Sequence, residues 1–316
     1  MMPWLKLVRW YNLIFTAIII WLMEKMVVVA ILNKALFYEQ LPGWMFYMLM
    51  LAVVFIAAGG YAINDYFDVK IDVINRPEKL IVTRSLSKQQ AMICHQLMTA
   101  IGVILGLIVS AVLKSWTLAI IFIFIPGLLW FYSSSYKRQF FVGNLIVATA
   151  AGITPMVIAF ANVAYLKLKY GDLMNYTTIT TDIYTWVGGF AFFAFLTTLS
   201  REIIKDLQDQ IGDRELECHT LPIIIGEKWT KVVVSVLFLL ILAFAFYAVY
   251  CLMPFGKEWG SVAMKYYFFG LFIPMICEFY LLFSAQLTQD YKNAQTLLKF
   301  IMLVGVLFSV VIRVML

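Results

Sequence analysis

Long apolar runs constrain the fold of this chain more than any other feature of its sequence. An α-helix needs about 20 mostly apolar residues to cross the roughly 30 Å hydrocarbon core of a bilayer. Nine runs of this kind cover residues 11–33, 44–66, 88–112, 116–135, 140–165, 185–206, 229–252, 262–286 and 294–316. The sequence therefore predicts an all-α, polytopic membrane protein with a bundle of nine transmembrane helices.

The composition excludes most other classes of protein. Hydrophobic residues make up 63% of the chain and charged residues 13%, whereas a soluble domain is about half apolar and about a quarter charged. The unbroken apolar runs also disfavour a membrane β-barrel, whose strands alternate apolar and polar residues. The four cysteines form no CxxC pair and the chain has two histidines, so we expect buried free thiols and no zinc or histidine-rich site. We expect no nucleic-acid partner.

The distribution of positive charge predicts the orientation in the membrane. Of the 24 Lys and Arg residues, 16 lie at the N-terminus or in the connections that would share its side, and 7 lie on the other side. Cytoplasmic loops carry the excess of Lys and Arg. We therefore expect an integral protein of a bacterial or archaeal-type cytoplasmic membrane, surrounded by membrane lipids. Its N-terminus, which shows no cleavable signal-peptide pattern, would be cytoplasmic and its C-terminus outside.

Two segments on the predicted cytoplasmic side concentrate the charges. Residues 64–88 and 201–231 together hold 21 of the 42 charged side chains. In the first segment Asn64, Asp68 and Asp72 are spaced i, i+4, i+8, which places them on one helical face. In the second, Asp209 and Asp213 repeat the i, i+4 spacing, and Asp206 precedes Asp209 by three residues.

Stacked carboxylates repel one another, and a divalent cation would remove this repulsion. Mg²⁺ prefers oxygen ligands and needs only one or two carboxylates when phosphate and water complete its shell. Many cations accompany the acids, namely Arg76, Lys79, Arg84, Lys137, Arg138, Arg201, Lys205 and Arg214. Magnesium alone does not require them, but a diphosphate does. The combination predicts a lipid diphosphate, with its head at the membrane surface and its tail between the helices.

These residues resemble the motifs of the UbiA superfamily of intramembrane prenyltransferases. Its NDxxDxxxD signature matches Asn64, Asp65, Asp68 and Asp72, and its DxxxD signature matches Asp209 and Asp213. The stretch from Tyr132 to Arg138 resembles the YSxxxKR element of the family, and Arg9 with Asn12 resembles its RPxN element. After Asn75-Arg76-Pro77 the usual RPxPSG continuation is absent, which leaves the roles of Lys79 and Arg84 open.

The resemblance implies nine helices around a central cavity, in a single domain of residues 1–316. A cytoplasmic cap would come from residues 67–87 and 207–228, with the active site facing the cytoplasm. It implies Mg-dependent transfer of a prenyl group from a prenyl diphosphate donor. By match, Asn64, Asp68 and Asp72 would hold one Mg²⁺ and Asp209 with Asp213 a second, with Asp65 and Asp206 as further candidate ligands. The diphosphate and the pocket would be bound by Arg76, Lys137, Arg138, Tyr132, Arg9, Asn12 and Lys205.

The acceptor stays open between two classes. The run from Arg201 to Asp206, with Gly212-Asp213-Arg214, looks most like the branch that prenylates geranylgeranylglyceryl phosphate. Members that act on 4-hydroxybenzoate, dihydroxynaphthoate or homogentisate share most of the motifs. A cation transporter is the non-enzymatic alternative, although transporter sites lie near the bilayer midplane on broken helices. The CDP-alcohol phosphotransferases are disfavoured because their Asp-Gly-x-x-Ala-Arg motif is absent.

Two acids lie inside predicted spans, where charged residues are functional candidates by default. We expect Glu24 to form a snorkelling pair with Lys25, and Glu278 to hydrogen-bond a neighbouring helix. Functional roles for both acids stay open.

Overall fold

The computed structural model describes residues 2–75, 77, 80–253, 257–258 and 260–315. Within them, nine helical spans are long and apolar enough to cross a membrane, which confirms the predicted number. The helical elements are α1 (Pro3–Leu7), α2 (Trp10–Leu22), η1 (Met23–Val28), α3 (Val29–Lys34), α4 (Gly43–Asn75), α5 (Lys88–Val112), α6 (Trp116–Ser134), η3 (Tyr136–Arg138), α7 (Val142–Tyr170), η4 (Gly171–Tyr176), α8 (Ile179–Glu215), α9 (Leu221–Tyr247), η5 (Ala248–Leu252), α10 (Val262–Tyr266), η6 (Tyr267–Phe272), α11 (Ile273–Ser284) and α12 (Thr288–Met315).

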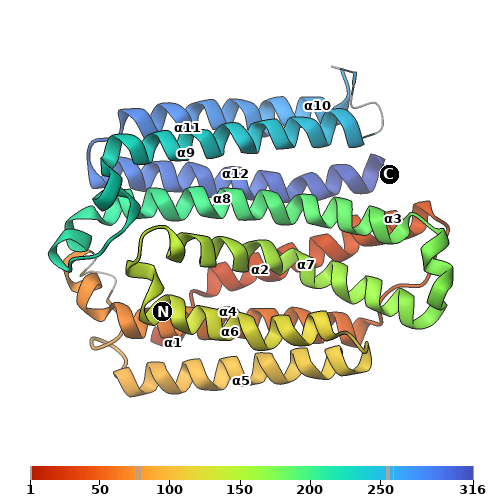
Figure 1. Ribbon diagram of the computed structural model, residues 1–316, viewed down its shortest axis with the longest axis horizontal. Coiled ribbons are helices and arrows are strands. Elements are labelled where there is room, and N and C mark those ends of the chain that lie inside the picture. Colours follow the sequence, from red (N-terminus) through yellow and green to blue (C-terminus); the bar gives the residue numbers. More distant parts are fainter. Residues whose placement is uncertain (1, 76, 78–79, 254–256, 259, 316) are drawn as a thin grey trace.

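The long helices run side by side along the longest axis of the molecule (Figure 1). One buried cluster, which includes Phe46 and Ile158, joins the first half of the chain to the start of α8. A second cluster, which includes Phe238 and Met275, joins the rest of α8 to α9, α11 and α12. The long helix α8 therefore belongs to both halves of the bundle and connects their cores.

Local sequence explains how several spans begin and pack. Ser87 starts α5 with a capping box, since its hydroxyl accepts from the Gln90 amide and the Gln90 side chain accepts from the Ser87 amide. Gly102 lets α5 approach α4 closely, because a Cβ there would lie 2.8 Å from the Ala52 carbonyl oxygen. Pro274 lies at the start of α11, and the π-helical turn η6 precedes it within the same span.

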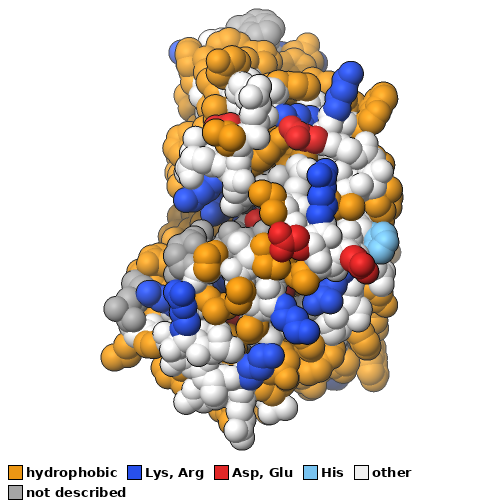
Figure 2. Space-filling model, turned by 90° about the vertical axis from the view of Figure 1, so that its left-hand side faces the viewer, with side chains coloured by type: hydrophobic (Ala, Val, Ile, Leu, Met, Phe, Trp, Pro, Cys, Tyr) orange, Lys and Arg blue, Asp and Glu red, His pale blue; other side chains and the backbone are white. Residues whose placement is uncertain are grey.

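The helices that carry the acidic segments are longer than predicted. The predicted spans 44–66 and 185–206 correspond to helices that continue to Asn75 and Glu215. Residues 67–75 of the expected cap segment 67–87 therefore belong to α4, and residues 207–215 and 221–228 of the segment 207–228 belong to α8 and α9. The α8–α9 connection is only residues 216–220. Both helix ends lie at the left-hand end of the molecule in Figure 1. Viewed from that end, Lys, Arg, Asp and Glu side chains gather over the middle of the surface (Figure 2).

Candidate active site

A cavity of about 440 Å³ lies between α2, α4, α6, α7, α8 and α12. Much of its wall is apolar and includes Ile19, Val53, Ile56, Ile125 and Leu129. Its polar lining side chains are Arg9, Asn12, Thr16, Tyr61, Asn64, Tyr132, Ser133, Thr154, Thr198, Arg201, Glu202, Lys205 and Lys299. The central cavity expected from the resemblance is thus present, and a polar region adjoins an apolar compartment within it.

The first acidic segment begins at this cavity, since Asn64 of α4 lines it. The Asn64 side-chain amide donates to Asp68 Oδ2 over 2.7 Å, and both residues are buried. Asp72 follows one turn later and is half-buried. The helical register predicted from the spacing therefore holds, because α4 continues without interruption past Asp72.

Asp65 is directed away from this line of residues. Arg9, which precedes α2, donates from a guanidinium nitrogen to Asp65 Oδ1 over 2.8 Å. The same guanidinium lies 5.0 Å from the centre of the Tyr61 ring. Arg9 therefore joins the start of α2 to α4 at the cavity, and Asp65 serves as its counter-ion.

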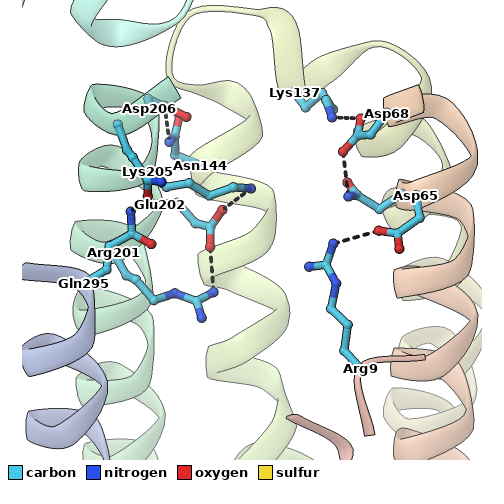
Figure 3. A network of polar contacts seen from close by, with 12 residues as sticks. Arg9, Asp65, Asp68, Lys137, Asn144, Arg201, Glu202, Lys205, Asp206 and Gln295 are labelled. Carbon is cyan, nitrogen blue, oxygen red and sulfur yellow. Dashed lines mark hydrogen bonds and ion pairs between the residues drawn. The ribbon is translucent and has the colours of Figure 1, made fainter. Parts of the chain in front are cut away.

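Lys137 of η3 reaches the α4 acids from the α6–α7 connection, where its ammonium forms an ion pair with Asp68 (Figure 3). Burial lowers the pKa of Lys137 to about 7, and the nearby charge of Lys205 adds to this effect. The direct ion pair with Asp68 favours the charged form, and Asp213 also acts in this direction. Carboxylates on both α4 and α8 therefore favour the charged form of Lys137.

The second acidic segment lies at the end of α8. Asp206 accepts a hydrogen bond of 2.7 Å from the Asn144 side chain of α7. The buried Asp213 accepts one of 3.0 Å from the hydroxyl of Thr220, the residue that precedes α9. Asp209 lies between them and is half-buried. Among the described residues, no three Asp, Glu, His or Cys side chains already converge on one point, so the two segments face the same region without forming a single cluster.

The predicted cations lie in different places. Lys205 lines the cavity, whereas Arg138 is exposed and its carbonyl accepts from the His219 amide over 2.8 Å. This bond joins the α6–α7 and α8–α9 connections. Arg84 is exposed in the turn before α5. Arg76 and Lys79 lie outside the described residues.

Several polar residues at the site had no assigned role in the sequence analysis. Glu202 accepts from Arg201 over 2.6 Å at the cavity, Asn144 holds Asp206, and Lys299 brings α12 into the lining. A polar side chain inside an apolar span was the available signal for Asn144. Lys299 is one of the 16 Lys and Arg residues on the predicted cytoplasmic side.

The two intramembrane acids differ from the expectations. Glu24 is fully buried and does not snorkel toward the surface. Its carboxylate accepts a hydrogen bond of 2.7 Å from the Asn162 side chain of α7. Lys25 lies apart from it, 5.5 Å from the centre of the Phe46 ring. Glu278 is also fully buried, and neither of its carboxylate oxygens has a hydrogen-bond partner among the described residues.

The cysteine expectation holds only in part. Cys94 and Cys218 are buried, whereas Cys251 and Cys277 are exposed on apolar spans. All four are free thiols.

Comparisons with known proteins agree with one another. The model of the UbiA prenyltransferase family matches residues 26–304. The digeranylgeranylglyceryl phosphate synthase of Methanosphaera stadtmanae is 33% identical over 229 residues, 72% of this chain and 71% of that protein. The digeranylgeranylglyceryl phosphate synthase of Pyrococcus horikoshii is 33% identical over 213 residues, 66% of this chain and 67% of that protein.

Solved structures share the fold. A structure described as a digeranylgeranylglyceryl phosphate synthase aligns with a TM-score of 0.62 and 23% identity, over 99% of this chain and 98% of that one. A UbiA homologue from Archaeoglobus fulgidus, bound to DMAPP and Mg²⁺, aligns with a TM-score of 0.58 and 11% identity, over 99% of this chain and all (100%) of that one.

Proposed function

The chain belongs to the UbiA prenyltransferase family and is a membrane-embedded prenyltransferase, and we propose that it transfers a prenyl group from a prenyl diphosphate to a glycerol phosphate lipid with Mg²⁺ as cofactor. The observation that carries this proposal is the position of Lys137. It pairs with Asp68 on α4, and the next residue, Arg138, is bound through its carbonyl to the His219 amide just beyond the end of α8. The acidic ends of α4 and α8 therefore adjoin the same α6–α7 connection, and Asn64 of α4 and Lys205 of α8 line a cavity whose wall is largely apolar.

The residues present fit magnesium. The side chains of Asn64, Asp68 and Asp72 on α4 and of Asp209 and Asp213 on α8 offer oxygen donors, which Mg²⁺ prefers, and phosphate and water oxygens would complete each shell. We assign one ion to each helix. Asp65 and Asp206 stay as further candidate ligands, each with one carboxylate oxygen bound by Arg9 or Asn144. When bound, the metal neutralises negative charge on the departing diphosphate.

The chain's own cations would bind the diphosphate, and its apolar walls would exclude water. Lys137 and Arg138, with Arg76, would hold the diphosphate, and Arg9 and Asn12 would line the pocket beside it. As the C–O bond of the donor breaks, the electron pair leaves with the diphosphate. The acceptor hydroxyl oxygen then bonds to the prenyl carbon, and its proton passes to the released diphosphate. Tyr132 lines the cavity, where its ring can stabilise the allylic cation, and the apolar wall keeps water from it.

The acceptor assignment has the support of the named relatives, which are digeranylgeranylglyceryl phosphate synthases. A glycerol phosphate lipid also suits a cavity with several cations beside an apolar compartment. The aromatic acceptors named above carry one carboxylate in place of a phosphate dianion, so they would need fewer cations.

We place the acidic ends of α4 and α8 in the cytoplasm, as the distribution of Lys and Arg predicts. In a background without the four native cysteines, a single cysteine at His219 should react only with membrane-permeant reagents in intact cells. A cysteine at Tyr176, in the exposed η4 turn at the opposite end of α8, should react with impermeant reagents. The reverse pattern would contradict this orientation.

The activity is tested with purified protein and labelled allylic prenyl diphosphates of C10 to C20. We expect diphosphate release and a prenylated glycerol phosphate lipid, both abolished by chelation of Mg²⁺. Hydroxyaromatic acceptors serve as the comparison. Transfer to a hydroxyaromatic and not to the glycerol phosphate lipid would replace the acceptor assignment, and no turnover with any donor would refute the proposal.

A further inference from the structure

A second cavity, of about 250 Å³, lies between α8, α9, α12 and the π-helical turns η5 and η6. It shares no lining residue with the candidate active site. On α8 its lining extends from Thr185 to Phe193, and Gly189, in the middle of this stretch, lies about 30 Å along the helix from Asp209. The cavity therefore lies toward the end of the bundle opposite the acidic ends of α4 and α8, which is the right-hand end in Figure 1.

The contact of α8 with α12 separates this second cavity from the candidate active site. Ala194 lines the active-site cavity, and its neighbour in the chain, Phe193, lines the second cavity. Successive residues of a helix point about 100° apart around its axis. The Phe193 ring lies directly on the backbone of Gly305 in α12, where an added Cβ would clash with it. The second cavity is therefore separate from the compartment that we assign to the prenyl chain of the donor.

The walls of the second cavity are apolar, and glycines leave its space open. None of the described residues that line it is charged. The Tyr267 hydroxyl, which could offer a polar contact, donates to the Leu242 carbonyl over 3.3 Å. A Cβ at Gly188 would meet no atom within 4 Å, and one at Gly189 would lie 3.6 Å from the tip of the Phe244 ring. A buried water needs two to four polar partners, so this space suits hydrocarbon and not water.

The lining of the second cavity continues onto the surface that the bilayer covers. Phe192 of α8, Tyr247 of α9 and Leu252 of η5 line the cavity and are also exposed on membrane-spanning helices. Tyr184 and Tyr250, which adjoin lining residues in the chain, are exposed as well. Tyrosine and tryptophan are enriched where a span meets the lipid head groups. The cavity is therefore accessible to lipid chains from the leaflet opposite the acidic helix ends.

We propose that this cavity between α8, α9 and α12 is a binding site for one hydrocarbon chain of a membrane lipid, separate from both substrates of the reaction. A dry apolar cavity of about 150 Å³ binds benzene, so a space of about 250 Å³ takes a chain segment of about ten carbon atoms, scaled from that case. If it were left unfilled, its walls would lose dispersion contacts. A lipid chain is the apolar group that reaches this opening from the bilayer. The proposal does not depend on the metal or on the acceptor.

Native mass spectrometry of the purified protein with a lipid of one defined mass, diphytanoyl phosphatidylcholine, tests the site. The wild-type protein should retain one lipid at detergent concentrations that remove the others. Gly189→Leu and Ala248→Leu fill the space from the α8 wall and the η5 wall. Each should lower the fraction of protein that carries the lipid by about fivefold or more, because the dispersion contacts of the bound chain are lost.

Gly127→Leu is the matched control, because Gly127 of α6 also has open space at its Cβ position and lines neither of the two cavities. It should retain the lipid as the wild-type protein does. Thermal unfolding in detergent distinguishes loss of the site from loss of the fold. Without lipid, Gly189→Leu and Ala248→Leu should unfold at the wild-type temperature or above it, since the new side chain enters empty space. Added lipid should raise the unfolding temperature of the wild type and of Gly127→Leu, and raise that of the two filled variants much less.

Retention of the lipid by both filled variants at the wild-type level would overturn the proposal, because the lipid would then bind elsewhere. Displacement of the lipid from the wild-type protein by a C20 prenyl diphosphate would also overturn it, because the cavity would then belong to the path of the donor. If one filled variant does not fold, the other decides. A loss of stability in both without lipid would show that the space is not available to an added chain, and would overturn the proposal as well.

Discussion

Lys137 and Asp68 form an ion pair one helical turn beyond Asn64, which lines the cavity, with 14% of the lysine side chain and 9% of the aspartate side chain exposed. The lysine comes from the α6–α7 connection and the aspartate from α4, 69 positions apart in the chain. The ammonium therefore satisfies a carboxylate that we assign to metal binding. A divalent ion at this site would compete with Lys137 for Asp68, which would release the lysine toward a phosphate.

The competition between Lys137 and the metal gives the first prediction. Lys137→Gln should raise the affinity for Mg²⁺ measured without substrate, because no ammonium has to leave Asp68. The same change should raise the KM for the prenyl diphosphate by about tenfold or more, because a charge-assisted phosphate contact is lost. Calorimetric titration with Mg²⁺ and steady-state kinetics measure the two effects. Lys70→Gln, an exposed position on α4, is the control, and a decrease in both affinities would contradict the competition.

The acids at the end of α8 give the second prediction. Asp213→Asn keeps an oxygen that can accept from Thr220 but removes the negative charge, and Asp209→Asn is the corresponding change one turn earlier. Each should lower kcat/KM on the order of 100-fold or more, since metal-assisted departure of the diphosphate loses several kcal/mol of stabilisation. Thermal unfolding in detergent should change little.

Asp182→Asn on the same helix is the control for these two variants, because Asp182 is half-buried near the opposite end of α8 and does not line the cavity. It should retain wild-type activity. Wild-type activity in either Asp209→Asn or Asp213→Asn would remove that residue from the ligand set.

Features with a local cause were predictable from the sequence. The nine spans follow from the length of the apolar runs, and the shared face of Asn64 and Asp68 follows from a spacing of one helical turn. The observed hydrogen bond between these two residues is a direct consequence of that spacing. The later ends of α4 and α8 also have a local cause, because the apolar runs mark where a helix enters the membrane, not where it ends in water.

Contacts between distant segments were not predictable in this way. Glu24 and Asn162 are 138 positions apart, and their contact depends on how α7 packs against η1. The sequence marks each as a polar residue in an apolar run, but it does not pair them. The same holds for Lys299, whose place in the cavity depends on the packing of α12 against α8 and α2.

The buried pair of Glu24 and Asn162 gives the third prediction. Asn162→Ala removes the only hydrogen bond that the described residues donate to the Glu24 carboxyl and should destabilise the protein by about 1–3 kcal/mol. Glu24→Gln combined with Asn162→Ala should recover part of the loss, because an amide is less costly to bury than a carboxylate. The midpoint of thermal unfolding in detergent measures both. Asn33→Ala, at an exposed position of α3, should have little effect, and equal stability of wild type and Asn162→Ala would show that this bond contributes nothing.

Glu278 gives the fourth prediction, because it lies fully buried on α11 with neither carboxylate oxygen partnered among the described residues. Burial of a polar group without a hydrogen bond is unfavourable, and Glu278 does not line the cavity. Glu278→Met, which has a similar length and no polar oxygen, should therefore stabilise the protein by about 1–3 kcal/mol and retain prenyl transfer. Thermal unfolding and initial rates measure the two effects, with the exposed Glu258→Met as control. If Glu278→Met folds but has lost activity, the carboxyl has a functional role, which is the usual expectation for an acid inside a membrane span.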